Sequence, residues 1–264
     1  MKPPASHSRD RYNIEALARG LDVLSLFSVE RPALSFSQIV KMVQLNKSTV
    51  YRVLSTLEAQ GYLEQDAATR LYRPGLRVLQ LGFTAVNSLE VRQIARPHLE
   101  KLSQALGETV SLAVLDGFRT VYVDRVRNQS IVGVTLGVGS SLPAHCSSLG
   151  QVLLADLPAA KLDALLAAHE LTAFTPKTLT SVPALRARLE EIRQRGYAVG
   201  DEELAPGLRA VSAAVRNGCG QAVAAVNVTG STERLPYPRL EQEIVPALLE
   251  TVGRISTALG YIFS

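Results

Sequence analysis

The sequence predicts an α+β protein with two domains: a small domain of helices and a hairpin, then a larger one of strands and helices. Three observations predict it. The chain has 264 residues, a length that favours two domains. Residues 35–74 read as two short helices followed by two short strands. From about residue 108 onward, groups of alternating apolar and polar residues flank helical segments, as in a mostly antiparallel sheet covered by helices.

The chain opens with a polar tail and an amphipathic helix. Residues 1–12 lack an apolar core, so they predict a disordered tail and do not read as a secretory signal. Residues 14–27 carry apolar side chains at helical spacing, and we expect this face to pack on the next helices and complete a three-helix core. The face consists of Ile14, Leu17, Leu21, Leu24 and Phe27.

The segment that follows predicts a winged helix-turn-helix. Ser35 is a suitable N-cap, and Gln38 completes a capping box. Asn46 breaks this first helix and can cap the second, which runs over about 47–60 and ends before Gly61. The second helix is expected to bury one face, made of Val50, Val53, Leu54 and Leu57.

Two short strands, 62–64 and 71–73, are then predicted to enclose the turn 66–70 and form a wing. The tip of this wing carries Arg70. Helix, turn, helix and wing in this order are typical of a module that places its second helix in the major groove of DNA.

The charge distribution favours DNA over the alternative, an ordinary helical hairpin with a polar outer face. No acidic residue lies between Glu30 and Glu58. Residues 1–74 hold ten Lys and Arg against seven Asp and Glu, a net +3 of the +4 of the whole chain, as binding to phosphates requires. The residues predicted to contact DNA are Ser37, Asn46, Lys47, Ser48, Thr49, Tyr51, Arg52, Ser55 and Arg70.

The remaining elements define the expected domain boundaries. We predict a tail over 1–12, the winged domain over 13–74, a linker helix over 75–90 and a second domain over 91–264. The apolar side of the linker helix (Leu76, Leu79, Phe83 and Val86) suggests packing against another surface, such as a second copy of the chain. In the second domain, helices are predicted at 91–106, from about 148, at 158–168, 183–195 and 240–259, and strands at 108–114, 120–126, 131–136, 197–201, 208–215 and 221–228.

The loop Pro143 to Gly150 is the candidate binding site of the second domain. Ser147 and Ser148 stand where a helix begins, and the free N–H groups and helix dipole there suit a carboxylate or another anion. Hydrogen-bonding side chains would face it from the strand that ends at Asn227 and Thr229. The sequence is equally compatible with an alternative in which the two serines only cap the helix.

The sequence gives no support for catalysis, a metal or a cofactor. His145 and Cys146 are adjacent, so they cannot easily face each other as base and nucleophile, and no third orienting residue is evident. The second cysteine, Cys219, lies far away in the sequence, which fits neither a metal site nor a disulfide framework and suits a reducing cytoplasm. No segment is long and apolar enough to predict a membrane span.

Nearly the whole chain, residues 14–261, resembles the IclR family of bacterial transcriptional regulators. The resemblance rests on several motifs in the same order: 18–24 (ARGLDVL), 45–54 (LNKSTVYRVL), 61–63 (GYL), 72–76 (YRPGL), 142–150 (LPAHCSSLG), 195–197 (RGY), 201–203 (DEE) and 207–209 (GLR). It implies a GAF-like α/β effector-binding domain behind the winged domain, dimers that often pair into tetramers, and palindromic operators.

The resemblance also implies an effector pocket and the residues that line it. These are Ser147, Ser148, Leu149, Gly200, Ala210, Asn227 and Thr229, with His145 in the same loop as a further candidate that is also expected to bond the loop. Because Gly200 and Ala210 are small, we expect a roomy pocket that suits a larger acid. Segments 114–117 and 142–146 look most like the branch that governs the breakdown of aromatic acids, including the protocatechuate and 4-hydroxybenzoate regulators.

The function predicted from the sequence is therefore a cytoplasmic, sequence-specific regulator of transcription whose grip on double-stranded DNA is changed by a small carboxylate. The effector would favour one state of the dimer and alter the spacing of the recognition helices. The sequence leaves two alternatives: a DNA-binding protein without an effector, and an enzyme fused to a DNA-binding domain.

Overall fold

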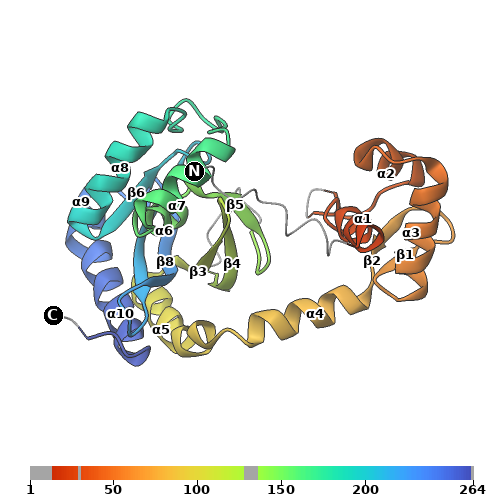
Figure 1. Ribbon diagram of the computed structural model, residues 1–264. Coiled ribbons are helices and arrows are strands. Elements are labelled where there is room, and N and C mark those ends of the chain that lie inside the picture. The colour runs from red at the N-terminus through yellow and green to blue at the C-terminus, as the bar shows by residue number, and fades with distance from the viewer. Residues whose placement is uncertain (1–13, 29–30, 128–135, 263–264) are drawn as a thin grey trace, which may run out of the picture. The chain divides into compact units, whose positions relative to one another are not determined.

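The structure, a computed structural model, describes residues 14–28, 31–127 and 136–262. The chain forms two compact units, Met1–Ala85 and Val86–Ser264 (Figure 1). The first unit is helical with a small hairpin, and the second is a six-stranded sheet with helices, so the predicted α+β organisation is confirmed.

The N-terminal unit is the predicted winged helix-turn-helix. Its core holds seven buried side chains: Val23, Leu34, Ile39, Val50, Leu54, Leu63 and Tyr72. The elements are α1 (Glu15–Leu24), α2 (Phe36–Val43), α3 (Lys47–Ala59), β1 (Leu63–Gln65), β2 (Tyr72–Pro74) and α4 (Leu76–Asn87).

Capping hydrogen bonds start α2 and α3 at the predicted residues. The Ser35 hydroxyl accepts a hydrogen bond from the Gln38 N–H, and the Gln38 side chain accepts one from the Ser35 N–H at 2.8 Å. Asn46 Oδ1 accepts the N–H of Thr49 at 2.8 Å. Gly61 follows α3 with a φ of 72°, a conformation that glycine adopts without a steric cost. Local sequence signals thus fix the start of both helices and the end of α3.

The predicted core face of the first helix is confirmed for Leu24 and Phe27, which pack against the core, and wrong for its other three residues. Ile14, Leu17 and Leu21 are 66%, 59% and 55% exposed, and it is Val23 that is fully buried. Only the C-terminal end of α1 reaches the core formed with α2 and α3. An apolar stripe shows that a face avoids water, but it does not say whether the same domain or another surface covers it.

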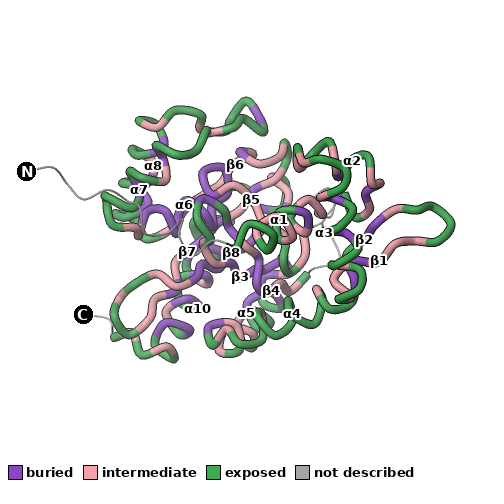
Figure 2. The backbone as a smooth tube through the Cα atoms, turned by 45° about the vertical axis from the view of Figure 1, so that its right-hand side comes forward, coloured by how far each residue is buried: buried purple, intermediate pink, exposed green. Residues whose placement is uncertain are grey.

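Helix α4 leaves the winged domain with no buried residue along its length (Figure 2). Leu76, Leu79, Leu81 and Phe83 are between 53% and 70% exposed. Apolar residues therefore face solvent on two helices of this unit, α1 and α4.

The C-terminal unit is built on one antiparallel sheet, as predicted. The strand order is β5-β4-β3-β8-β7-β6. Its strands are β3 (Thr109–Asp116), β4 (Arg119–Val126), β5 (Ser141–Pro143), β6 (Tyr197–Asp201), β7 (Leu208–Arg216) and β8 (Ala222–Ser231). The three-residue strand β5 was expected to be loop, because its Gly- and Ser-rich surroundings give no strand signal. The strand predicted at 131–136 lies, except for its last residue, outside the described residues.

Helices cover both faces of this sheet (Figure 1). On one face, α5 (Glu90–Leu106) and α10 (Val245–Ala258) pack against the larger apolar core. On the other face lies α6 (Ser148–Ala155), with α7 (Ala159–Ala168) and α8 (Val182–Arg195) completing a second core. The face under α6 contains many small or polar residues, among them Ser111, Ala113, Ser212 and Asn227.

The last predicted helix, 240–259, is found as one helical segment that begins a few residues earlier and contains a π-helical turn. The chain forms a short helix α9 (Tyr237–Arg239), a π-helical turn over Leu240–Ile244, and then α10. Pro246 stands in the first turn of α10 and has no N–H for a bond to the preceding turn. A wide turn before it accommodates the missing hydrogen bond.

Candidate DNA-binding surface and effector pocket

The residues predicted to contact DNA lie on the outside of the winged domain. Thr49 is half-buried, and the other eight are exposed. Asn46 uses its side-chain oxygen for the cap of α3, and Ser48 donates to the same oxygen at 2.8 Å. Their direct role in the structure is therefore to start the helix, while Lys47, Tyr51 and Ser55 present free side chains along it.

Several cations of this surface lack a carboxylate partner. Among the described residues of the N-terminal unit, the ion pairs are Arg19–Glu15 and Arg73–Glu64. Lys47, Arg52 and Arg70 take part in neither. A guanidinium or ammonium group that is not neutralised inside the protein remains available for phosphate.

The wing tip is held by one carboxylate. Asp66 Oδ1 accepts hydrogen bonds from the N–H groups of Ala68 and Thr69, at 3.1 and 2.7 Å. These bonds, chiefly that from Thr69, lower the pKa of Asp66 below its ordinary value. Arg70 follows with a φ of 58°, so the turn projects its side chain from a fixed backbone.

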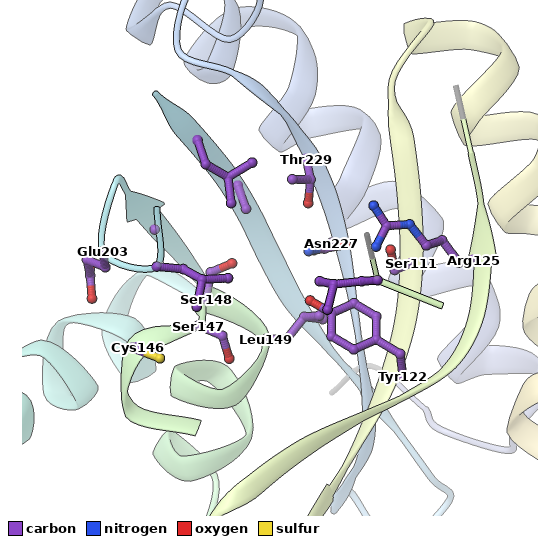
Figure 3. A pocket seen from close by; sticks show the side chains of 15 residues that line it. Ser111, Tyr122, Arg125, Cys146, Ser147, Ser148, Leu149, Glu203, Asn227 and Thr229 are labelled. Carbon is purple, nitrogen blue, oxygen red and sulfur yellow. The ribbon is translucent and has the colours of Figure 1, made fainter. Parts of the chain in front are cut away.

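In the C-terminal unit, a cavity of about 40 Å³ lies between the sheet and the start of α6 (Figure 3). Seven of the eight residues predicted for the effector site line this cavity: Ser147, Ser148, Leu149, Gly200, Ala210, Asn227 and Thr229. The eighth, His145, does not line it. Its Nε2 lies 3.0 Å from the Thr172 carbonyl oxygen, and its ring stacks on Phe118, so His145 ties the loop to its surroundings.

The cavity is smaller than expected from the small residues Gly200 and Ala210. A Cβ on Gly200 would lie 3.4 Å from the Cβ of Ser148. This distance is an ordinary van der Waals contact, so residue 200 already lies against α6 and its missing side chain adds little space. A cavity of about 40 Å³ has room for roughly three water molecules.

Both serines at the start of α6 are used within the protein. Ser147 accepts from the Gly150 N–H at 3.1 Å and so caps α6. Ser212 donates to Ser148 Oγ at 2.7 Å. Ser147 thus has the capping role that the sequence suggested, and it also lines the cavity, so its role toward a ligand stays a prediction.

A β-bulge brings a residue to the cavity that the sequence did not predict. Across β3 and β4, Ser111 pairs with Arg125 and Ala113 pairs with Tyr122, with a register shift between them. Tyr122 and Arg125 are three residues apart and would face opposite sides of a regular strand. The extra residue of the bulge places both on the cavity side.

Arg125 and Asn227 supply unpartnered polar atoms to the cavity. Arg125 Nε and Asn227 Oδ1 are buried without a hydrogen-bond partner. Figure 3 shows the two side chains together on the side of β4 and β8, with Ser111 beside them. Burial lowers the pKa of the Arg125 guanidinium, which nevertheless stays charged at neutral pH.

The other charged group of the cavity, Glu203, is already compensated. Its Oε1 accepts from Arg188 Nη1 at 3.1 Å, and its Oε2 accepts from Gln151 Nε2 at 2.6 Å. Burial raises the pKa of Glu203, while Arg188 opposes that shift. Arg125 is therefore the uncompensated charge among the described residues that line the cavity.

Cys146 also lines the cavity. Burial raises the pKa of its thiol to about 12, so the reactive thiolate is rare at neutral pH. Among the residues that the structure describes, no group of three or more His, Cys, Asp or Glu side chains is arranged to hold a metal ion.

Known protein families account for both units. The family model of the IclR helix-turn-helix domain matches residues 16–67, and that of the C-terminal domain of the bacterial transcriptional regulator IclR matches residues 83–257. The chain belongs to the IclR family. The resemblance stated from the motifs is confirmed, and with it the prediction of a DNA-binding regulator of transcription that is not an enzyme.

IclR relatives match over nearly the full chain. The transcriptional regulator XynR of Escherichia coli K12 is 34% identical over 249 residues, which is 94% of this chain and 98% of that protein. The Pca regulon regulatory protein of Pseudomonas putida is 34% identical over 235 residues, or 89% and 80% of the two chains. An IclR homologue from Microbacterium hydrocarbonoxydans, solved in complex with 4-hydroxybenzoate, superposes with a TM-score of 0.78 at 29% identity, covering 92% and 98% of the two chains.

None of the helices in the described part of the chain has both the length and the apolar character needed to cross a membrane.

Proposed function

We propose that this IclR-family regulator binds a palindromic operator as a dimer, in the cytoplasm, and that a small organic acid in the cavity under α6 changes its affinity for the operator. The observation that carries the proposal is the presence of two prepared surfaces on one chain. One is the exposed, unneutralised face of α3 with its wing, and the other is a cavity with an uncompensated guanidinium.

The proposed dimer rests on exposed apolar residues of the winged domain. A groove of about 630 Å³ runs between α1, α3 and α4, lined by Leu17, Leu21 and Leu81 among others. Burying such side chains against a second copy would remove apolar surface from water, worth about 25 cal/mol per Å². A twofold dimer would place two α3 helices at related half-sites, which is why we expect a palindromic operator.

The proposed effector class is a carboxylic acid. The Microbacterium homologue is described in complex with 4-hydroxybenzoate, a phenolic carboxylate. In this chain, the corresponding charge would meet Arg125. An aromatic acid fits only if the cavity widens from about 40 Å³. Movement of α6 away from the sheet would provide the space. It would also be a conformational change through which effector binding could alter DNA binding.

The test begins with selection of genomic duplex fragments by the purified full-length chain, followed by footprinting. We expect a protected site with twofold symmetry whose affinity falls steeply with salt. Addition of small carboxylates, benzoates included, should change this affinity. Retention of no duplex fragment at low ionic strength would contradict the DNA-binding proposal, and a footprint on a single half-site would contradict the dimer.

Replacement of Arg52 by alanine should weaken operator binding by about 1–3 kcal/mol if the guanidinium contacts a base. Arg52 is exposed on α3 and also borders the groove with α1. Fluorescence anisotropy with the footprinted operator measures the loss, and Lys161→Ala, which removes an exposed cation from α7, is the matched control. An unchanged operator affinity combined with weaker dimerisation in sedimentation would assign Arg52 to the groove instead.

A further inference from the structure

The cavity contains a positive charge, that of Arg125, which no described carboxylate of the protein pairs. Arg125 is half-buried, its Nε has no hydrogen-bond partner, and it forms no ion pair with any described residue. The nearest carboxylate in sequence, Asp124, accepts from Arg96 Nη1 at 2.7 Å instead. A cation removed from water without a partner is costly, so its retention here calls for an anion from outside the chain.

A second unpartnered group lies beside it and specifies more than charge. Asn227 is 4% exposed, and its Oδ1 has no hydrogen-bond partner. Strand register places it close to Arg125, because β3 lies between β4 and β8 and Ser111 pairs with both residues. Ser111 and Asn227 therefore face the same space as the guanidinium (Figure 3). An unpaired acceptor that faces the cavity suits a ligand that carries a hydrogen-bond donor.

The opposite wall of the cavity carries no net charge. The hydroxyl oxygens of Ser147 and Ser148 accept hydrogen bonds from the Gly150 N–H and the Ser212 hydroxyl, and Glu203 is paired with Arg188. The uncompensated positive charge of the cavity therefore lies on the strand side, while the helix start can still donate hydrogen bonds.

We infer that the effector is a hydroxycarboxylate whose carboxylate binds the Arg125 guanidinium and whose hydroxyl donates to Asn227. This inference rests on the proposed effector function and names the chemistry of that site. A planar guanidinium can hold both carboxylate oxygens, and the neighbouring amide selects the acid that carries a hydroxyl over the one that lacks it. Arg125 then selects ligands that carry a carboxylate, and Asn227 selects among them those that also carry a hydroxyl.

The first experiment measures binding to the full-length protein by calorimetry, without DNA. The probes are three matched pairs: glycolate and acetate, lactate and propionate, and 4-hydroxybenzoate and benzoate, with lactamide and 4-hydroxybenzamide as uncharged analogues. In at least one pair, the hydroxylated acid should bind about tenfold more tightly than its partner, which is the worth of one hydrogen bond. Its amide should show no binding. Equal binding of acid and amide, or no binding by any pair, overturns the inference.

The second experiment separates a ligand anchor from a structural arginine. Arg125→Met should lower the affinity for the tightest-binding hydroxy acid at least about thirtyfold, since the ligand loses a charged hydrogen-bonding partner. In the absence of ligand, the same variant should melt higher by about 2–4 °C, because a half-buried charge without a protein partner is removed. Arg209→Met is the matched control, because Arg209 donates to Asp201 and to the Leu235 carbonyl oxygen, and its loss should lower Tm.

A fall in Tm for Arg125→Met comparable to that of Arg209→Met, with ligand affinity unchanged, would make Arg125 structural and overturn the inference. Operator binding is measured separately. If a hydroxy acid binds through Arg125 but leaves operator affinity unchanged, the regulatory proposal fails while the ligand assignment stands. If an effector changes operator affinity and the Arg125→Met protein still binds that effector normally, the regulatory proposal stands and the ligand assignment fails.

Discussion

Replacement of Leu54 by alanine is expected to destabilise the winged domain by about 2–5 kcal/mol and to abolish operator binding. Leu54 is fully buried in α3, on the side opposite to the predicted DNA-contacting residues. The core of this unit has seven buried side chains, and truncating one leaves a cavity that neighbours such as Ile39 and Leu63 cannot fill. A small domain has little stability to lose, so α3 would no longer be held in position.

Thermal unfolding of the full-length variant should therefore show an early transition for the winged domain and an unchanged one for the C-terminal unit, because each has its own core. Leu249→Ala in α10, where the leucine is 37% exposed, is the matched truncation. It should leave operator affinity at the wild-type level. Full operator binding by Leu54→Ala at ordinary temperature would contradict the role of this core in presenting α3.

The winged domain could be predicted from sequence because its signals are local. The cap at Ser35, the cap at Asn46 and the glycine at residue 61 each act within a few residues, and each is found in the structure. The covering of α1 could not be predicted, because Leu17 and Leu21 have the same spacing whether a core or another molecule buries them. Periodicity reports that a face is apolar and contains no information on its partner.

The effector cavity shows the same limit at a finer scale. Motif resemblance located seven of its lining residues, but Arg125 was missed. The reason is the bulge in β4: simple alternation puts Arg125 on the face opposite to Tyr122, and only the pairing with β3 shows the extra residue between them. The one signal in the sequence is an arginine inside the predicted strand 120–126, where it follows Asp124, and such a pair is equally typical of a strand end in solvent.

The charge of the cavity connects this missed residue to regulation. Asp124 and Arg125 are adjacent on β4 but act on opposite faces of the sheet. Asp124 accepts from Arg96 of α5, and Arg92, one turn earlier on α5, donates to the carbonyl oxygen of Val123 at 3.1 Å and to Asn87 Oδ1 at 2.7 Å. A ligand that displaces β4 through Arg125 would thus act directly on hydrogen bonds at the α4–α5 junction. For effector binding to be coupled to the winged domain, this junction must be able to adopt two arrangements.

Gly150→Ala is expected to disrupt the wall of the cavity and to lower the stability of the C-terminal unit by about 1–3 kcal/mol, the usual cost of overpacking. A Cβ at this position would lie 2.7 Å from the carbonyl carbon of Ala144, and closer still to its neighbouring backbone atoms. Ala144 cannot move freely, because its N–H donates to the Phe118 carbonyl oxygen at 2.9 Å and Pro143 precedes it. Either the turn over Ala144–Cys146 or the start of α6 must shift.

That shift would break the hydrogen bond between Ser148 and Ser212 of the sheet, so effector affinity should fall together with Tm. Gly82→Ala is the matched control, because a Cβ on Gly82 of α4 meets nothing within 4 Å. Alanine favours a helix over glycine by about 1 kcal/mol, so the control should be neutral or stabilising. Calorimetric melting and effector titration of both variants give the answer. A Gly150→Ala protein with wild-type Tm would show that the contact between Gly150 and Ala144 relaxes at no cost, and that the cavity wall is softer than its close packing indicates.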